Sequence, residues 1–470
     1  MRRDAGARIE GALDHAVAAP IVAAIAGRRR IARGRALAYF RLRRTEGAIL
    51  LGGLALGIDI GTTGVRASAI DVARVVVASA ATRFVEFCAD PKSPAAWRRA
   101  LEAALTKLAA ERRLAEVDAL AVDGTSGTML AIDAAGEPVG PPLMYDEPCS
   151  DAALIRRIVA LAPAGSAALG ATSALARAIL LQARPGAARV AHQADWIAGL
   201  LSGRFDVSDE NNALKTGYDP IARRWPEWIG EAGVDVARLP CVLAPGAPFA
   251  ETSAFARRFG IPASARVCAG TTDGCASFLA TGAEGIGEGV TALGSTLVVK
   301  MLTREPIDSP AYGVYSHRLG DLWLAGGASN TGGAVIAKLF AAEELEALTA
   351  RVDPDHPTGL DYYPLLRAGE RFPINDPALP PRLQPVPEDR ARFFQAVLEG
   401  VAEIEALGYR RLKELGAPEL ASVRAVGGGA GNAAWTRIRQ RRISAPFLPA
   451  ASQEASVGVA RLALKGAGFD

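Results

Sequence analysis

The sequence predicts an α/β protein with two domains that face each other across a cleft. The main observation is a Gly-Thr-Thr turn beside an aspartate, which occurs at residues 61–63 and again at 270–272. Each turn follows a short apolar run typical of a buried strand. A chain of 470 residues is long enough for two or three domains. Ligands of open α/β sheets bind at the carboxyl ends of strands, so two facing ends would form a site for a nucleotide and a second substrate.

The first turn follows a strand in which apolar residues alternate, so that Asp59 lies on the opposite side from Ile58 and Ile60. Turn amides and threonine hydroxyls suit phosphate oxygens, and a carboxylate suits a water-bound magnesium ion. The alternative is an ordinary hairpin with a surface aspartate. The residues expected at the phosphate are Gly61, Thr62, Thr63 and Gly64.

The second turn follows the expected strand 266–269 and ends at Asp273, directly before an expected helix. A boundary between the two domains is expected near residues 260–262, where Gly-Ile-Pro stands. Asp273 is either a reacting group or a helix N-cap, because aspartate is common at that position.

Three consecutive glycines, Gly427, Gly428 and Gly429, follow an expected strand late in the chain, and Asn432 precedes an expected helix. Glycines leave no side chains on the surface, so a flat group such as adenine or ribose could lie against the backbone. A flexible loop is the alternative.

Composition favours an intracellular enzyme. The net charge of +3 gives no reason to expect nucleic acid or an anionic surface as the main partner, and five scattered cysteines are typical of reduced thiols in the cytoplasm. The first 52 residues carry eleven arginines and four acidic residues, or +7. Their apolar run is too short to span a bilayer, so we expect no stable membrane insertion. This extension is expected to be helical or loosely ordered, with a transit peptide or a membrane-surface helix as alternatives.

With these motifs in order, the sequence resembles the FGGY carbohydrate kinases of the actin-like ATPase superfamily. The resemblance runs from about Leu54 to the C-terminus, and its motifs stand in the family's order: 59–64 for the first phosphate site, 270–274 for the catalytic aspartate, 294–296 for the second phosphate site and 427–432 for adenosine. It implies two actin-like, ribonuclease H-like domains with an interdomain cleft. The implied divisions are a basic extension over 1–53, a sugar-binding domain over 54–262 and an ATP-binding domain over 263–470.

A polar turn over residues 123–128 indicates the subgroup. Aligned on Gly124 and Asp133, xylulose kinases carry Gln-Met-His where this chain has Thr125-Ser126-Gly127. The Arg-Glu pair of glycerol kinases is also absent here. Together with the segments 206–219, 315–319 and 326–330, the turn is similar to a cyanobacterial and plant branch associated with D-ribulose phosphorylation.

The resemblance implies ATP and Mg²⁺ as cofactors and a small sugar as the other partner. Asp273 would accept the proton of the sugar hydroxyl, Asp59 would hold magnesium through water, and both would contact the sugar with Ser126. Ser126 could instead bond its own backbone. Lys215 and Lys300 are expected to be surface or structural residues, and His317 a structural one. The other implied ATP contacts are Gly294, Ser295 and Thr296. Alternatives for the whole chain are a xylulose, pentulose or polyol kinase, or a non-catalytic actin-like nucleotide switch.

Overall fold

The computed structural model describes residues 42–45, 48–51, 53–111 and 113–469. Residues 1–52 form one unit and residues 53–470 a second. In the first unit, β1 (Leu42–Thr45) pairs antiparallel with β2 (Ala48–Leu51). This hairpin differs from the helical or loosely ordered extension that we expected, since Gly47 and Gly52 bound a short apolar run that suits a strand. The rest of that expectation lies outside the described residues.

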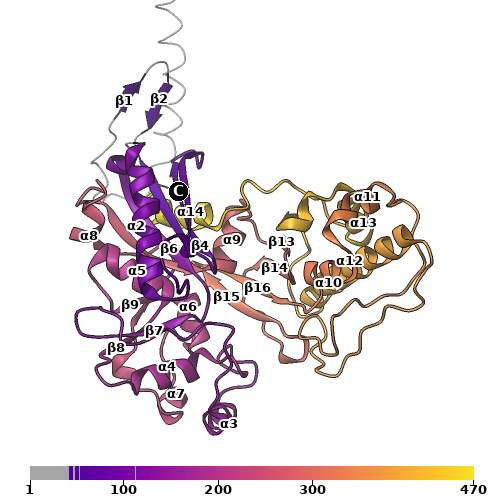
Figure 1. The fold of residues 1–470 in the computed structure, drawn as a ribbon, viewed down its shortest axis with the longest axis horizontal. Coiled ribbons are helices and arrows are strands. Elements are labelled where there is room, and N and C mark those ends of the chain that lie inside the picture. Colours follow the sequence, from indigo (N-terminus) through magenta and orange to yellow (C-terminus); the bar gives the residue numbers. More distant parts are fainter. Residues whose placement is uncertain (1–41, 46–47, 52, 112, 470) are drawn as a thin grey trace, which may run out of the picture. The chain divides into compact units, whose positions relative to one another are not determined.

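The first sheet of the second unit has six strands in the order β11-β12-β6-β3-β4-β5. Strands β4 and β6 of this sheet are labelled in Figure 1. Strands β3, β6 and β12 are parallel, and β3, β4 and β5 form an antiparallel meander. The carboxyl ends of the parallel strands β3, β6 and β12 meet at one edge of the sheet, where Asp59 pairs in register with Asp123. The strands are β3 (Leu54–Ile60), β4 (Gly64–Asp71), β5 (Val76–Arg83), β6 (Val117–Gly124), β11 (Pro248–Glu251) and β12 (Arg266–Thr272).

Helices cover both faces of this sheet. Alternate residues of β3, among them Ile58 and Ile60, are buried with Trp97 and Trp196 of the helices on one face. On the other face a Cβ atom on Gly57 would lie only 1.9 Å from the Ser456 carbonyl oxygen, so the last helix packs directly on the backbone of β3. The first face carries α2 (Pro94–Ala110) and α5 (Gln193–Ser202), and the second carries α9 (Asp273–Ala280) and α14 (Ala455–Gly466).

Between β6 and β12 the chain forms an insertion of short elements. Its strands pair in two small sheets, β7 with β8 and β9 with β10. Within it, α6 begins at an N-cap, where the Asp209 carboxylate accepts hydrogen bonds from the amides of Asn211 and Asn212. The elements are β7 (Met129–Ile132), α3 (Ala152–Leu161), α4 (Ala174–Gln182), β8 (Arg189–His192), β9 (Val207–Asp209), α6 (Glu210–Lys215), α7 (Glu227–Glu231), β10 (Cys241–Leu243) and α8 (Ala254–Arg257).

The second sheet has five strands in the order β15-β16-β14-β13-β17. The 25-residue helix α12 supplies much of its core. The strands are β13 (Glu288–Leu293), β14 (Leu297–Thr303), β15 (Tyr315–Leu319), β16 (Leu322–Ala328) and β17 (Ser422–Val426). The helices are α10 (Gly333–Leu339), α11 (Leu345–Ala350), α12 (Arg390–Glu414) and α13 (Ala433–Arg442). Within the described residues, no helix combines the length and the apolarity needed to cross a bilayer.

The two sheets divide the chain differently from the boundary expected at residues 262/263. Strand β12 pairs in parallel with β6, so residues 266–272 belong to the first sheet, and α14 returns to that sheet. The first Gly-Thr-Thr segment is the turn between β3 and β4, whereas the second is the end of strand β12 and forms no turn. Both segments therefore belong to one sheet and do not face each other from two. The long insertion separates β12 from its partner in sequence, and a short apolar strand carries no signal of which sheet it joins.

A buried ion pair holds the second sheet's helices together. Arg439 of α13 donates to both carboxylate oxygens of Glu405 on α12, at 2.6 and 2.7 Å, and both side chains are fully buried. The Thr291 hydroxyl of β13 donates to the same carboxylate at 2.5 Å. The pair therefore connects α12, α13 and β13 at one point.

Replacing Glu405 by alanine is expected to lower the free energy of unfolding by about 3–5 kcal/mol, because it leaves the Arg439 guanidinium buried without a counter-charge. The matched control is Glu403→Ala on the same helix, since Glu403 pairs with Arg410 and Arg442 at the surface. That change should cost less than about 1 kcal/mol. Chemical denaturation measures both, and equal losses would contradict the assignment.

Candidate active site

Three carboxylates meet at the carboxyl edge of the first sheet. Asp59 and Asp123 are the penultimate residues of β3 and β6, and Asp273 follows β12 as the first residue of α9. The structure thus brings together Asp59 and Asp273, which the sequence indicated. Asp123 was missed as a site residue. The sequence feature that could have indicated Asp123 is an aspartate near the end of a buried strand. This feature indicates a site residue only when β6 is known to lie between β3 and β12.

The electrostatics of this edge are dominated by burial. Burial raises the pKa of Asp59 to about 6, although Arg66, 3.4 Å away, opposes the shift. The pKa of Asp123 lies well above its usual range, because the side chain is buried beside Asp59 and Asp273. Neither carboxylate oxygen of Asp123 has a hydrogen-bond partner among the described residues.

Asp273 does not cap its helix. The N-cap position of α9 is Thr272, and an Asp273 oxygen accepts only the adjacent Gly274 amide, at 2.7 Å. Burial raises the pKa of Asp273, while that amide, Lys300 and Lys215 oppose the shift. The side chain stays partly exposed and is therefore accessible to a reacting hydroxyl.

Both lysines lie near Asp273, and their contacts agree with the expected surface or structural role. The Lys215 ammonium donates to the Tyr315 hydroxyl at 2.8 Å, and Lys300 lies 3.9 Å from the Cys275 sulfur. Both are half-buried, and neither forms an ion pair with a carboxylate in the described part of the chain. His317 is buried, as expected of a structural residue, and packs beside Tyr315.

The loop after β6 presents Ser126. Its hydroxyl is buried and forms no hydrogen bond in the described chain, so it does not close a turn with its own backbone. The buried Arg177 holds this loop by donating to the carbonyl oxygens of Gly127 (3.1 Å), Tyr145 (2.7 Å) and Glu147 (2.9 Å). Sequence reasoning missed Arg177, because an arginine within a helix is usually exposed.

The turn between β3 and β4 is a tight hairpin closed by the Gly61 amide, which donates to the Gly64 carbonyl at 3.0 Å. A Cβ atom on Gly64 would lie 2.0 Å from the Thr82 carbonyl oxygen, so packing requires this glycine. A Cβ atom on Gly61 would lie 3.7 Å from the Gly64 carbonyl oxygen, an ordinary van der Waals contact, so packing does not require this glycine. Thr62 and Thr63 are exposed, as phosphate contacts would need to be.

The turn between β13 and β14 holds Gly294, Ser295 and Thr296. The amides of Gly333 and Ala334 donate to the carbonyl oxygens of Gly294 and Ser295 at 2.8 and 3.0 Å. The start of α10 therefore supports this turn from behind.

The glycine cluster divides into packing and open positions. A Cβ atom on Gly427 would lie 2.8 Å from the Leu293 carbonyl, and one on Gly429 would lie 2.5 Å from the Trp435 ring. Gly428 alone of the three faces open space. Asn432 caps α13 by accepting the Trp435 amide at 2.9 Å, so its carboxamide oxygen has a structural role.

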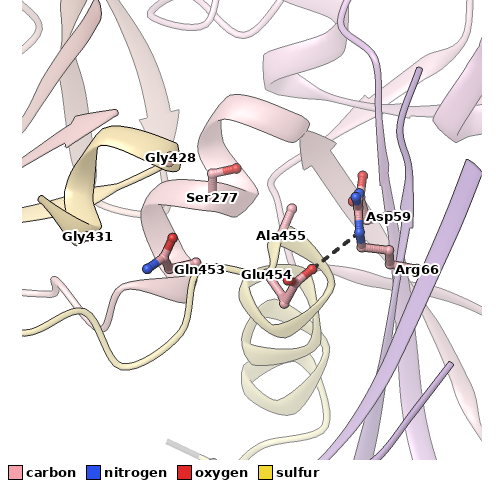
Figure 2. A pocket seen from close by; sticks show the side chains of 9 residues that line it. Asp59, Arg66, Ser277, Gly428, Gly431, Gln453, Glu454 and Ala455 are labelled. Atoms are coloured by element: carbon pink, nitrogen blue, oxygen red, sulfur yellow. Dashed lines mark hydrogen bonds and ion pairs between the residues drawn. The ribbon is translucent and has the colours of Figure 1, made fainter. Parts of the chain in front are cut away.

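A cavity of about 500 Å³ joins the carboxylate edge to the glycine cluster. Figure 2 shows Arg66 beside Asp59 and Glu454, and both ion-pair distances are 3.4 Å. Of the residues named from the sequence, Asp59, Gly427 and Gly428 line the cavity, whereas Ser126, Asp273 and the threonine turns do not. The lining residues that sequence reasoning missed are Arg66, Ser277, Gly431, Gln453, Glu454 and Ala455.

The comparison with protein families supports this arrangement. Residues 289–467 match the model of the FGGY family of carbohydrate kinases, C-terminal domain. This segment is similar to the C-terminal domain of that family. It includes the second sheet, the glycine cluster and α14.

Proteins named as kinases of xylulose or glycerol are similar to the chain over most of its length. A protein of Streptomyces rubiginosus named xylulose kinase is 27% identical over 430 residues, which are 87% of each chain. A solved structure titled xyloylose kinase from Brucella ovis has a TM-score of 0.76 at 22% identity and covers 89% of this chain and 91% of its own. Plasmodium falciparum glycerol kinase with ADP has a TM-score of 0.74 at 15% identity, over 88% and 90%. The predicted two-domain actin-like α/β fold is confirmed, and the matches agree with the predicted enzyme class, a phosphotransferase with an alcohol acceptor.

The raised pKa of Asp59 predicts that the ligand-free protein loses stability as the pH rises. A carboxyl group with a higher pKa in the native state favours folding below its unfolded pKa of about 3.8, and this advantage is lost as the pH passes the native value of about 6. Asp59→Asn should therefore gain on the order of 2–3 kcal/mol relative to the wild type between pH 4 and pH 8. Urea denaturation at both pH values measures this gain, and a pH-independent difference would contradict it.

Proposed function

We propose that the chain is an ATP-dependent carbohydrate kinase that transfers the γ-phosphate to a hydroxyl of a small ketose, D-ribulose, giving D-ribulose 5-phosphate. The observation that carries the kinase proposal is the cavity that joins the carboxylate edge to an open glycine surface. The observation that favours D-ribulose is Thr125-Ser126-Gly127, which stands where xylulose kinases carry Gln-Met-His, with the Ser126 hydroxyl buried and free.

The residues present fit a nucleotide. Gly428 and Gly431 line the cavity, and a Cβ atom on either would meet nothing within 4 Å, so a nucleoside can lie against bare backbone. The turns at 61–64 and 294–296 offer amides and hydroxyls for phosphate oxygens. Arg66 supplies a cation at the carboxylate end of the same cavity.

The residues present also fit Mg²⁺ that keeps most of its water. Within the described residues, no group of three acidic, histidine or cysteine side chains is arranged to hold a metal directly. Asp59 lines the cavity, and neither carboxylate oxygen of the neighbouring Asp123 has a hydrogen-bond partner among the described residues, so this edge has oxygen atoms available to the water shell of a cation. When bound with ATP, the ion would supply neutralisation of phosphate charge, and Asp59 would hold it through water.

Asp273 is the proposed general base. Its carboxylate would take the proton of the acceptor hydroxyl as that oxygen forms its bond to the γ-phosphorus and the bond to the ADP oxygen breaks. Ser126 would hold another hydroxyl of the sugar, which compensates for the burial of its own hydroxyl.

D-xylulose is the second candidate acceptor, because relatives such as the Streptomyces rubiginosus and Streptomyces coelicolor proteins are named xylulose kinase. A panel of ketoses, polyols and glycerol, assayed by coupled ADP release, decides between them. We expect D-ribulose to give the highest kcat/KM. Equal or better turnover of D-xylulose or glycerol would remove the D-ribulose assignment, and slow ATP hydrolysis indifferent to every sugar would indicate a nucleotide switch.

Replacing Asp273 by asparagine is expected to lower kcat by about 10²–10⁴-fold while nucleotide binding stays nearly intact, because an amide keeps the shape but cannot accept the proton. Steady-state kinetics and nucleotide titration measure the two effects. Asp151→Asn is the control, since Asp151 is a helix N-cap far from the proposed chemistry in sequence and its oxygen accepts the Leu154 amide. More than about a tenth of the wild-type kcat in Asp273→Asn would exclude the role of base.

A further inference from the structure

One buried asparagine connects the two sheets. Strand β15 is the edge strand of the second sheet, and β16 is its partner in the described chain. The Arg318 amide donates to Asn211 Oδ1, and Asn211 Nδ2 donates to the Arg318 carbonyl, both at 3.0 Å. The carboxamide therefore satisfies both backbone groups of Arg318, as a neighbouring strand would do.

The same side chain also reaches the first sheet. Asn211 Nδ2 donates to the Thr271 hydroxyl at 2.9 Å, and Thr271 lies in β12, two residues before Asp273. Asn211 and Thr271 are both fully buried. A single carboxamide thus joins the strand that leads to Asp273 to the open edge of the other sheet.

Other contacts reinforce this connection. All of them run from the segment 210–220 to β15. The Lys215 ammonium donates to the Tyr315 hydroxyl at 2.8 Å, and Arg318 Nη1 donates to the Pro220 carbonyl at 2.9 Å. Arg318 also lies 3.9 Å from the buried Glu210 carboxylate. Asn211 differs from these residues because it is fully buried and its one carboxamide bonds both β12 and β15.

We propose that Asn211 is a positioning residue for phosphoryl transfer, which sets Asp273 against the phosphate turn of the second sheet. Strand β15 pairs with β16, β16 pairs with β14, and β14 follows the turn 294–296 directly. A shift of β15 would therefore move that turn relative to Asp273. This inference rests on the proposed function, because it assigns Asn211 a part in the same reaction.

The chain offers a matched control in the next residue. Asn212 is equally buried on α6, but its amide donates to Asp209 at 2.6 Å, within its own segment. Asn211→Ala and Asn212→Ala remove the same atoms from neighbouring positions, and only the first breaks the connection between the sheets. A second pair is Thr271→Val, which removes the hydroxyl, and Thr271→Ser, which keeps it.

Steady-state kinetics with ATP and the best acceptor test the proposal. Asn211→Ala and Thr271→Val should lower kcat about 10–100-fold, with both KM values within about threefold, because misplacement of about 1 Å costs rates of this order. Asn212→Ala and Thr271→Ser should keep kcat within about threefold. If Asn211→Ala folds and keeps the wild-type kcat, the proposal is overturned. If Asn211→Ala does not fold, a wild-type kcat in Thr271→Val overturns it instead. Equal loss in the control Asn212→Ala or Thr271→Ser would also do so.

Amide hydrogen exchange tests the connection without relying on activity. Peptides covering residues 315–319 should exchange faster in Asn211→Ala and Thr271→Val than in the wild type or the controls. Unchanged exchange would overturn the proposed connection. If the wild type turns over no sugar but the variants still exchange faster, the proposed function is wrong and so is the positioning role that depends on it. The connection between the sheets would still stand.

Discussion

The burial of three carboxylates at one sheet edge is the constraint on which the rest of the site depends. Parallel pairing of β3, β6 and β12 places Asp59, Asp123 and Asp273 together whether or not their charges are compensated. The cations near this edge are the exposed Arg66 and two half-buried lysines. The three cations equal the three carboxylates in number, but they are more exposed than Asp59 and Asp123. Keeping these two buried carboxylates ionised therefore costs free energy in the ligand-free protein. Such a site gains most from a ligand that brings its own cation.

The local elements of the site could be predicted from the sequence, whereas their assembly could not. The alternation around Asp59 predicted its side of β3 correctly, because Ile58 and Ile60 are buried in the core on the other face. The strand before Asp273 was also recognised. The sheet that this strand joins was not predicted. Strands β6 and β12 pair across an insertion of about 140 residues, and hydrophobic periodicity carries no information on such long-range pairing. Asp123 was missed for the same reason.

Side chains that act through backbone contacts were the least predictable. Arg177 holds the Ser126 loop through carbonyl oxygens, and Asn211 binds both backbone groups of Arg318. Carbonyl and amide partners are present at every residue, so the sequence does not indicate which ones a side chain will find. The glycine cluster shows a related limit. Gly427 and Gly429 are required by packing and Gly428 is open, although all three look alike in sequence.

The return of α14 to the first sheet has a consequence for the order in which the protein can fold during synthesis. Strand β3 begins at residue 54, but the helix that covers its second face begins at residue 455. Gly57 lies directly against the backbone of that helix, and the small residues Ala55, Ala119 and Ala121 are buried with it. On the ribosome, the part of this face that α14 covers must stay uncovered until every strand of the second sheet has been synthesised, because the last of them, β17, ends at residue 426. The first domain is therefore begun first and completed last, and its exposed apolar face is a natural binding surface for a chaperone during translation.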